Sequence, residues 1–202
     1  MTLREIKQTS PERFMLIFSD GTELKTTLGI ITERFIHSGM EFDEDEYNGL
    51  VSASGLAMAK ARALRIINAR PMSREELRKR LIEKGETPEN AEECADWLCR
   101  MGLINDAEYA GSVVRHYAAK GYGASRIKQE LRRHGVPREM WDEAMLQMPE
   151  QDAYLERFIR TRLRDPGDRA QVKKVSDALF RRGYSWDQIK HALNEFDTQG
   201  DY

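Results

Sequence analysis

The chain has 202 residues, of which 33% are charged and 40% hydrophobic, and its formal net charge at pH 7 is -2. This length is enough to bury the core of one large or two small domains. No apolar stretch approaches the roughly 18 residues that a membrane span needs, and the first residues lack the basic start and apolar core of a signal peptide. We therefore expect a soluble protein of the cytoplasm without a membrane partner.

Residues 1–55 have the pattern of a small β-hairpin followed by helix. Apolar residues fill both faces of residues 14–18, Asp20 and Gly21 signal a tight turn, and residues 22–28 return as a second strand. A lone hairpin is marginally stable in water, so we expect it to pack on the helices that follow. Helical stretches are predicted near 29–37 and from Asp43 onward, where the acidic residues of 41–46 suit a helix N-terminus.

A repeated spacing organises the rest of the chain. Three times a leucine stands four residues before a glycine, with another apolar residue four positions before the leucine. This spacing marks the buried stripe of a helix that a glycine ends. The three sets are Leu77, Leu81 and Gly85; Ile127, Leu131 and Gly135; and Val175, Leu179 and Gly183. Because the glycines are 50 and 48 residues apart, we favour three copies of one unit over an irregular helical bundle.

Helix start signals divide each copy into three helices. They are the pairs Ser73 with Glu76, Ser185 with Gln188, Thr87 with Pro88 and Asn105 with Glu108. The predicted helices span 56–69, 73–84 and 88–101 in the first copy, 106–119, 124–134 and 137–147 in the second, and 150–164, 168–182 and 186–196 in the third.

The expected fold is therefore mainly α. Three tandem three-helix repeats form an elongated curved array, and a small N-terminal β-hairpin with a helical segment precedes them. The predicted segments are 1–55 for this extension, 56–104 for the first repeat, 105–148 for the second, and 149–202 for the third repeat with a short C-terminal tail.

Charge alternates in sign along the chain behind the near-neutral total. Residues 1–55 hold five basic and ten acidic side chains, whereas residues 60–84, 113–134 and 157–182 are net basic. Residues 86–96 lie between two of these blocks and hold five acidic side chains and no basic one. The near-neutral total therefore does not argue against a nucleic-acid partner, because the charge is not evenly spread.

No catalytic pattern is present. The sequence has no phosphate loop, nucleophile elbow or zinc-binding helix motif, and its histidines lack ligand spacing, so we expect neither an enzyme nor a metal or cofactor. The glycines at 121 and 123 lie between two predicted helices, which favours a connector over a nucleotide-binding turn. Cys94 and Cys99 point about 140° apart on one helix and are interpreted as free thiols.

Cationic faces remain as candidate binding surfaces. On the helix predicted over 124–134, Ile127 and Leu131 define the buried side and the basic residues lie opposite. Arginine outnumbers lysine in the chain, which modestly favours binding of phosphates or carboxylates over a merely solvated face. The candidate partner-binding or DNA-binding residues are Arg65, Arg74, Arg78, Lys79, Arg115, Lys120, Arg126, Lys128, Arg132, Arg133, Lys173, Lys174 and Arg181. Trp97 and the apolar residues of the three glycine-ended helices should be core.

Four segments resemble sequence motifs of the RecX family. Residues 70–77 (RPMSREEL) resemble its RPxSxxEL helix start, and residues 102–110 (GLINDAEYA) its junction between repeats. Residues 120–131 (KGYGASRIKQEL) are similar to the family's KGxxxIxxEL segment, and residues 179–185 (LFRRGYS) to its LxRRG(F/Y)S ending. The resemblance covers about residues 56–196; the connector at 165–168 and the C-terminal residues depart from it.

The resemblance implies a function that the residues alone do not. RecX proteins bind RecA and RecA filaments on single-stranded DNA, and they modulate, usually by inhibition, its recombinase, ATPase and coprotease activities. An elongated protein with alternating charge could then gain affinity from several weak contacts. We expect a monomer. The alternative is a helical repeat protein that binds nucleic acid directly and acts without RecA.

Overall fold

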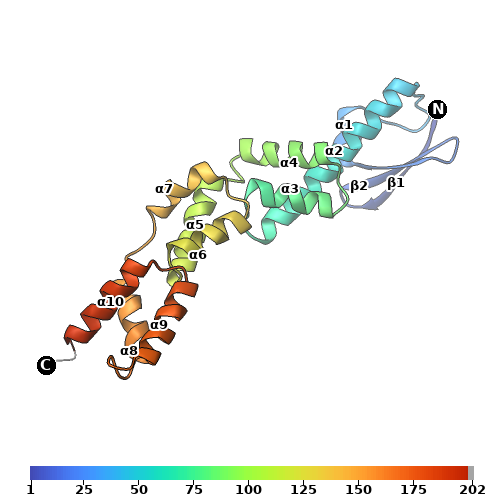
Figure 1. The fold of residues 1–202 in the computed structure, drawn as a ribbon. Coiled ribbons are helices and arrows are strands. Elements are labelled where there is room, and N and C mark those ends of the chain that lie inside the picture. The colour runs from blue at the N-terminus through green and yellow to red at the C-terminus, as the bar shows by residue number, and fades with distance from the viewer. Residues whose placement is uncertain (200–202) are drawn as a thin grey trace. The chain divides into compact units, whose positions relative to one another are not determined.

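The computed structural model describes residues 1–199, which form two compact units divided between Ile104 and Asn105 (Figure 1). The predicted first repeat ends at the same point. In the described residues the buried apolar side chains gather in four clusters, one for the N-terminal extension and one for each repeat. The division into four segments at 55, 104 and 148 stays a proposal, because one helix joins the first two clusters.

The first unit begins with a three-stranded antiparallel sheet. Its strands are β1 (Leu3–Ser10), β2 (Arg13–Phe18) and β3 (Glu23–Thr27), in the order β1-β2-β3. The predicted turn at Asp20 and Gly21 joins β2 to β3, and the Asp20 carboxylate accepts a hydrogen bond from the Thr22 backbone N–H at 2.9 Å. The sequence therefore predicted the β2–β3 hairpin correctly.

Strand β1 was not predicted. Its apolar residues Leu3 and Ile6 are three positions apart, whereas their partners Phe18 and Leu16 are two positions apart. The register shift between Leu3 and Glu5 takes up the extra residue. A bulge of this kind hides the two-residue alternation by which a strand is recognised. The extension is thus a sheet rather than a hairpin.

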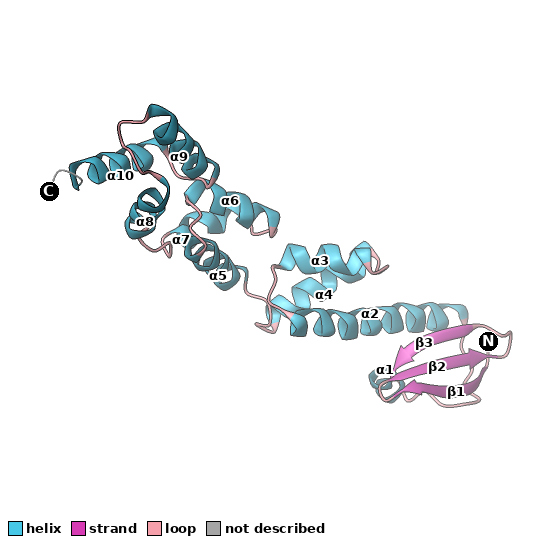
Figure 2. Cartoon of the chain, turned by 90° about the horizontal axis from the view of Figure 1, so that it is seen from below, coloured by secondary structure: helices cyan, strands magenta, loops and turns pink. Residues whose placement is uncertain are grey.

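A single long helix links this sheet to the first repeat. Helix α1 (Leu28–Glu33) is short, and α2 (Glu44–Ala69) runs without a break through the expected start of the first repeat at 56 (Figure 2). Leu50 packs on the sheet, where Ser54 also shares a hydrogen bond of 2.8 Å with Thr26. Ala59 and Ala63, further along α2, belong to the core of the first repeat. The helix predicted from Asp43 onward and the helix predicted over 56–69 are therefore one helix that serves two cores.

Helices α3 (Arg74–Glu83) and α4 (Pro88–Arg100) complete the first repeat. The second unit contains α5 (Asp106–Ala119), α6 (Ala124–Arg133), a 3-10 turn η1 (Arg138–Met140), α7 (Trp141–Met145), α8 (Asp152–Arg162), α9 (Arg169–Arg181) and α10 (Trp186–Gln199). The mainly helical fold is confirmed, and eight of the nine predicted helices lie at their expected places. The helix predicted over 137–147 is wrong in form, since a 3-10 turn and a five-residue helix replace it.

The three glycines end equivalent helices. Gly85, Gly135 and Gly183 have φ of 88°, 69° and 93°, a left-handed conformation that glycine adopts without steric cost. In each case the residue after the glycine donates its N–H to a leucine carbonyl, at 3.0, 3.0 and 3.3 Å. This leucine stands four positions before the glycine. This is the Schellman arrangement of a helix C-terminus. The leucines are fully buried, as predicted, whereas Trp97 is only partly buried.

Candidate interaction surface

The predicted cations of α3 are engaged within the first unit. Arg74 donates from Nε and Nη2 to Asp96 of α4, at 2.9 and 2.7 Å, and also pairs with Glu92. Arg78 binds both carboxylate oxygens of Glu75 at 2.8 and 3.1 Å. We call these five residues the α3–α4 network. Hydrogen bonds to Glu92 and Asp96 raise the pKa of Arg74, and the pair with Glu75 raises that of Arg78.

The α3–α4 network neutralises Arg74 and Arg78, which the sequence predicted to bind a partner. Lys79 is exposed and reaches Glu75 at 3.4 Å, so it is the most accessible of the three candidates on α3. The acidic block at residues 86–96 supplies Glu92 and Asp96, which explains why basic and acidic segments alternate there. The α3 face therefore contributes to packing of α3 on α4.

The four predicted cations of helix α6 fall into two groups, one with and one without a carboxylate partner. Glu130, a buried carboxylate, pairs with Arg126 at 3.0 Å and with Arg133 at 2.7 Å, and Arg133 also donates to the Tyr117 hydroxyl at 2.9 Å. The hydrogen bond to Tyr117 raises the pKa of Arg133. These two arginines thus neutralise a buried charge in the second unit.

Lys128 and Arg132 differ, because they are exposed and the structure gives neither an ion pair with a carboxylate among residues 1–199. Both line a shallow pocket of about 540 Å³ that also involves Arg138 and Trp141. The Arg138 guanidinium lies 5.7 Å from the centre of the Trp141 ring, and the indole N–H donates to the Val136 carbonyl at 2.9 Å. We call this the Trp141 pocket; its remaining lining residues are Gln129, Gly135 and Val136.

The Trp141 pocket has the chemistry of an anion site. Three cations surround one side of a fixed indole, and an aromatic face beside cations suits a nucleobase next to its phosphate. The same cations suit carboxylates of an acidic protein surface. Sequence reasoning found Lys128 and Arg132 but missed Arg138 and Trp141, which lie in a predicted regular helix beside acidic residues. No local signal could have found them, since a proline such as Pro137 also precedes regular helices.

The other candidates of the second unit are dispersed. On α5, Arg115 pairs with Gln147, and the Lys120 ammonium lies 5.4 Å from the centre of the Tyr117 ring. On α9, Lys173, Lys174 and Arg181 are exposed and have no carboxylate partner in the described part of the chain. These three offer the second unpaired basic face of this unit.

One arginine of the motif segments is structural. Arg182 lies within 5.2–5.8 Å of the ring centres of Tyr122, Tyr154 and Phe158, and its Nη1 donates to the carbonyls of Lys120 and Gly121, each at 3.3 Å. The Gly123 N–H in turn donates to the Arg182 carbonyl at 2.8 Å. The segments 120–131 and 179–185 thus meet to join the second and third repeats.

Arg65, the remaining candidate, is exposed on α2 and donates from Nε to the Ala61 carbonyl at 3.3 Å. It lines a groove of the first unit that is described below.

Within residues 1–199 no group of His, Cys, Asp or Glu side chains is arranged to hold a metal ion. Burial raises the pKa of Cys94 to about 11, so this cysteine is a protonated thiol at neutral pH. No described helix has the length and apolar character of a membrane span.

Family models match the first and the second repeat. The model of the first three-helix domain of RecX matches residues 59–98, and that of the second three-helix domain of RecX matches residues 105–145. The chain is also similar in fold to a crystal structure of regulatory protein RecX, with a TM-score of 0.74 and 23% identity over 96% of this chain and 98% of that one. A second similar structure is RecX from Lactobacillus salivarius, with a TM-score of 0.64 and 22% identity over 72% of this chain and 99% of that one.

Curated relatives are more similar in sequence. The regulatory protein RecX of Xanthomonas oryzae pv. oryzae (strain PXO99A) is 35% identical over 143 residues, which are 68% of this chain and 86% of the relative. That of Leptothrix cholodnii is 32% identical over 145 residues, 71% of this chain and 92% of the relative. Members of this group are regulatory proteins rather than enzymes. The chain belongs to the RecX family.

Proposed function

We propose that this protein binds RecA and RecA filaments on single-stranded DNA and modulates RecA, in most settings as an inhibitor of its recombinase, ATPase and coprotease activities. The family supports the choice of RecA as partner. The binding surface is proposed from one observation: Lys128 and Arg132 are exposed and have no carboxylate partner among the described residues. We further propose that the protein acts as a monomer in the cytoplasm.

Two basic faces of the second unit support binding at several points. One is the Trp141 pocket, and the other comprises Lys173, Lys174 and Arg181 on α9. Exposed charge pairs contribute about 0.2–1 kcal/mol each, so a single face would bind weakly. Two faces on one chain raise the affinity for a partner that repeats along a filament. In this proposal Arg74 and Arg78 mainly stabilise the fold, as the α3–α4 network indicates.

The test measures the DNA-dependent ATPase of RecA with the protein added below stoichiometry. The variant Lys128→Glu/Arg132→Glu is expected to need about tenfold more protein for the same effect, since two attractive charges become repulsive. Lys7→Glu/Lys25→Glu is the matched control, because both lysines are exposed on the sheet and the charge change is equal. The control should act like the unmodified protein.

Two outcomes would contradict the proposal. No effect of the unmodified protein on its cognate RecA would remove the function itself. A Lys128→Glu/Arg132→Glu variant as active as the control would leave the function but remove the surface. Circular dichroism of each variant establishes that the helices remain folded.

A second candidate function is direct binding of nucleic acid without RecA. The specific observation in its favour is Trp141 with its cations, since aromatic rings beside arginines hold single strands through stacking and phosphate contacts. It predicts affinity for a single-stranded oligonucleotide that falls steeply with salt, by a slope of about -0.7 per phosphate neutralised. A salt slope unchanged by Lys128→Glu/Arg132→Glu would exclude the Trp141 pocket as that site.

A further inference from the structure

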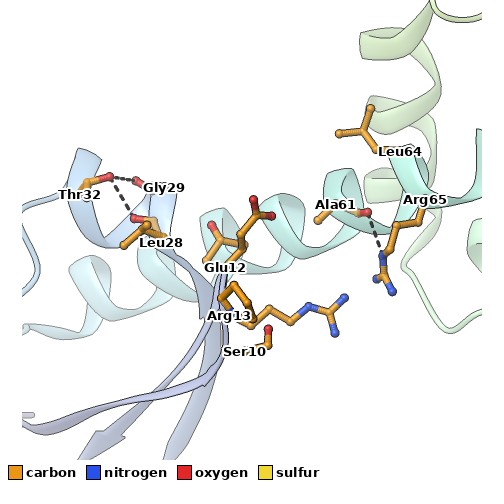
Figure 3. A pocket seen from close by; sticks show the side chains of 11 residues that line it. Ser10, Glu12, Arg13, Leu28, Gly29, Thr32, Ala61, Leu64 and Arg65 are labelled. Atoms are coloured by element: carbon orange, nitrogen blue, oxygen red, sulfur yellow. Dashed lines mark hydrogen bonds between the residues drawn. The ribbon is translucent and has the colours of Figure 1, made fainter. Parts of the chain in front are cut away.

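The first unit contains a groove at the open end of its sheet. The β1–β2 turn (Ser10, Pro11 and Glu12) forms one wall, and the start of α1 forms another. Residues Ala61, Leu64 and Arg65 of α2 close the groove, which has a volume of about 830 Å³ (Figure 3). This volume falls in the range of about 300–1,000 Å³ that is typical of ligand pockets. The Leu28 N–H donates to the Glu12 carbonyl at 3.2 Å, so two chain segments of the wall are held together.

Two arginines from different elements reach over this groove. Arg13 begins β2 and Arg65 lies on α2, and Figure 3 shows their guanidinium groups extending toward one another. The structure gives neither side chain an ion pair with a carboxylate anywhere in residues 1–199. The nearby Glu12 carboxylate points away from both guanidinium groups (Figure 3). Two unpaired cations therefore face the same space.

The walls between the arginines are aliphatic. Pro11, Leu28, Ala61 and Leu64 line the groove, and no aromatic ring is among its lining residues. Leu28 is 45% exposed although it is a large apolar side chain. Such walls can bury an aliphatic side chain of a ligand but offer no ring on which a base would stack.

We propose that this groove binds an extended segment of a partner protein in which carboxylates flank an aliphatic side chain. The two guanidinium groups would receive the carboxylates as charge-assisted hydrogen bonds, and the aliphatic walls would bury the side chain between them. Residues 1–55 carry ten acidic and five basic side chains. This excess of acid opposes a long polyanion such as nucleic acid and disfavours it relative to a short acidic peptide.

This site is separate from the Trp141 pocket, which belongs to the other unit. The proposal assigns a ligand class, an acidic peptide, to Arg65, which is one of the predicted partner-binding cations. It adds Arg13, which the sequence did not single out, as the second arginine of the site. The inference does not depend on the proposed function, since its readout is peptide binding without RecA.

The experiment measures fluorescence polarisation of a labelled peptide that alternates aspartate with leucine, titrated with the full chain. We expect saturable binding that Arg13→Glu/Arg65→Glu weakens by about tenfold or more. Arg4→Glu/Lys7→Glu is the matched control, because both side chains are exposed on β1 and the charge change is the same. The control should bind within about twofold of the unmodified protein, as expected for charges outside the contact.

Gly29→Phe tests the apolar part of the groove with both arginines retained. A Cβ at Gly29 would meet only the Thr27 Oγ1 at 3.7 Å, an ordinary contact, so the backbone accepts a side chain at this lining position of the groove. We expect it to weaken peptide binding by about fivefold or more, since the aliphatic side chain loses its place.

The proposal is overturned if the peptide does not bind at concentrations up to about 1 mM. It is also overturned if Arg13→Glu/Arg65→Glu binds like its control. Binding of a deoxythymidine oligonucleotide with the same arginine dependence, and none of the peptide, would make the groove a phosphate site instead. If the Lys128→Glu/Arg132→Glu variant lost RecA regulation, the interpretation of these peptide-binding results would not change. The two proposals can therefore fail independently.

Discussion

Helices α3 and α6 occupy the same place in successive repeats but use their cations differently. Both have ten residues and both end in a Schellman glycine. Arg74 and Arg78 of α3 are tied to Glu75 and to the acids of α4, whereas Lys128 and Arg132 on α6 have no carboxylate partner among residues 1–199. Arg78 and Lys128, which stand at equivalent positions of the repeat, thus serve packing in one copy and present free charge in the next.

The difference lies in the helix that follows. Helix α4 is a regular helix of 13 residues that carries Glu92 and Asp96 within reach of Arg74. After α6 the chain forms η1 and the five-residue α7 instead, and it places Arg138 and Trp141 beside Lys128 and Arg132. A basic helix face therefore indicates binding only where the neighbouring helix does not neutralise it.

Removing the buried leucine of each helix tests their equivalence and should have the largest effect. Leu81→Ala and Leu131→Ala each delete a fully buried side chain, which costs about 2–5 kcal/mol of unfolding free energy. Urea unfolding followed by circular dichroism measures both. A loss below about 1 kcal/mol for one of the two would show that its core can collapse around the cavity, and the helices would not be equivalent.

The two Schellman glycines Gly85 and Gly183 should differ in their tolerance of a side chain. For Gly85→Ala nothing lies within 4 Å of the added Cβ, so only the left-handed backbone costs about 1–2 kcal/mol. At Gly183 the Cβ would also lie 2.4 Å from the Arg126 backbone nitrogen, which adds about 1–3 kcal/mol of overpacking. Thermal unfolding of both variants measures the difference; equal losses would contradict the close contact between the second and third repeats.

These contacts mark the limit of what the sequence could predict. Periodicity and glycine spacing located Leu81 and Gly85 and their equivalents, because local backbone geometry decides those positions. Ion pairing between helices does not follow a local period. Arg74 and Arg132 therefore looked alike until α4 and η1 were placed beside them. Likewise the β-bulge after Leu3 hid a strand whose pairing is non-local.

Replacing one arginine in each helix by methionine separates the two roles. Arg74→Met should lower the unfolding free energy by up to about 1 kcal/mol, the usual range of exposed ion pairs, and leave RecA regulation unchanged. Arg132→Met should change stability by less than about 0.5 kcal/mol, as surface substitutions do, and weaken regulation. Urea unfolding and the RecA ATPase give the two readouts. If Arg74→Met weakened regulation and Arg132→Met did not, the partner would bind Arg74 in competition with the carboxylates of α4. Arg132 would then be a solvated side chain without a binding role.

Acid titration of the α3–α4 network should give the smallest effect. The hydrogen bonds from Arg78 lower the pKa of Glu75 below its ordinary value of about 4.5. A carboxyl whose pKa is lower in the folded state binds its proton more readily when unfolded, so its stabilising contribution is present above about pH 4.5 and is lost as the pH falls through the folded value.

Glu75→Gln should therefore be less stable than the unmodified protein at pH 6, and the gap in unfolding free energy should narrow as the pH falls below about 4.5. Urea midpoints at several pH values measure it. The background Arg78→Met provides the control, because Glu75 then keeps only its weaker partner Lys79 and the same substitution should produce a smaller pH-dependent gap. A gap of equal size in both backgrounds would mean that Arg78 does not hold Glu75, and that Arg78 is as free as its equivalent on α6, Lys128.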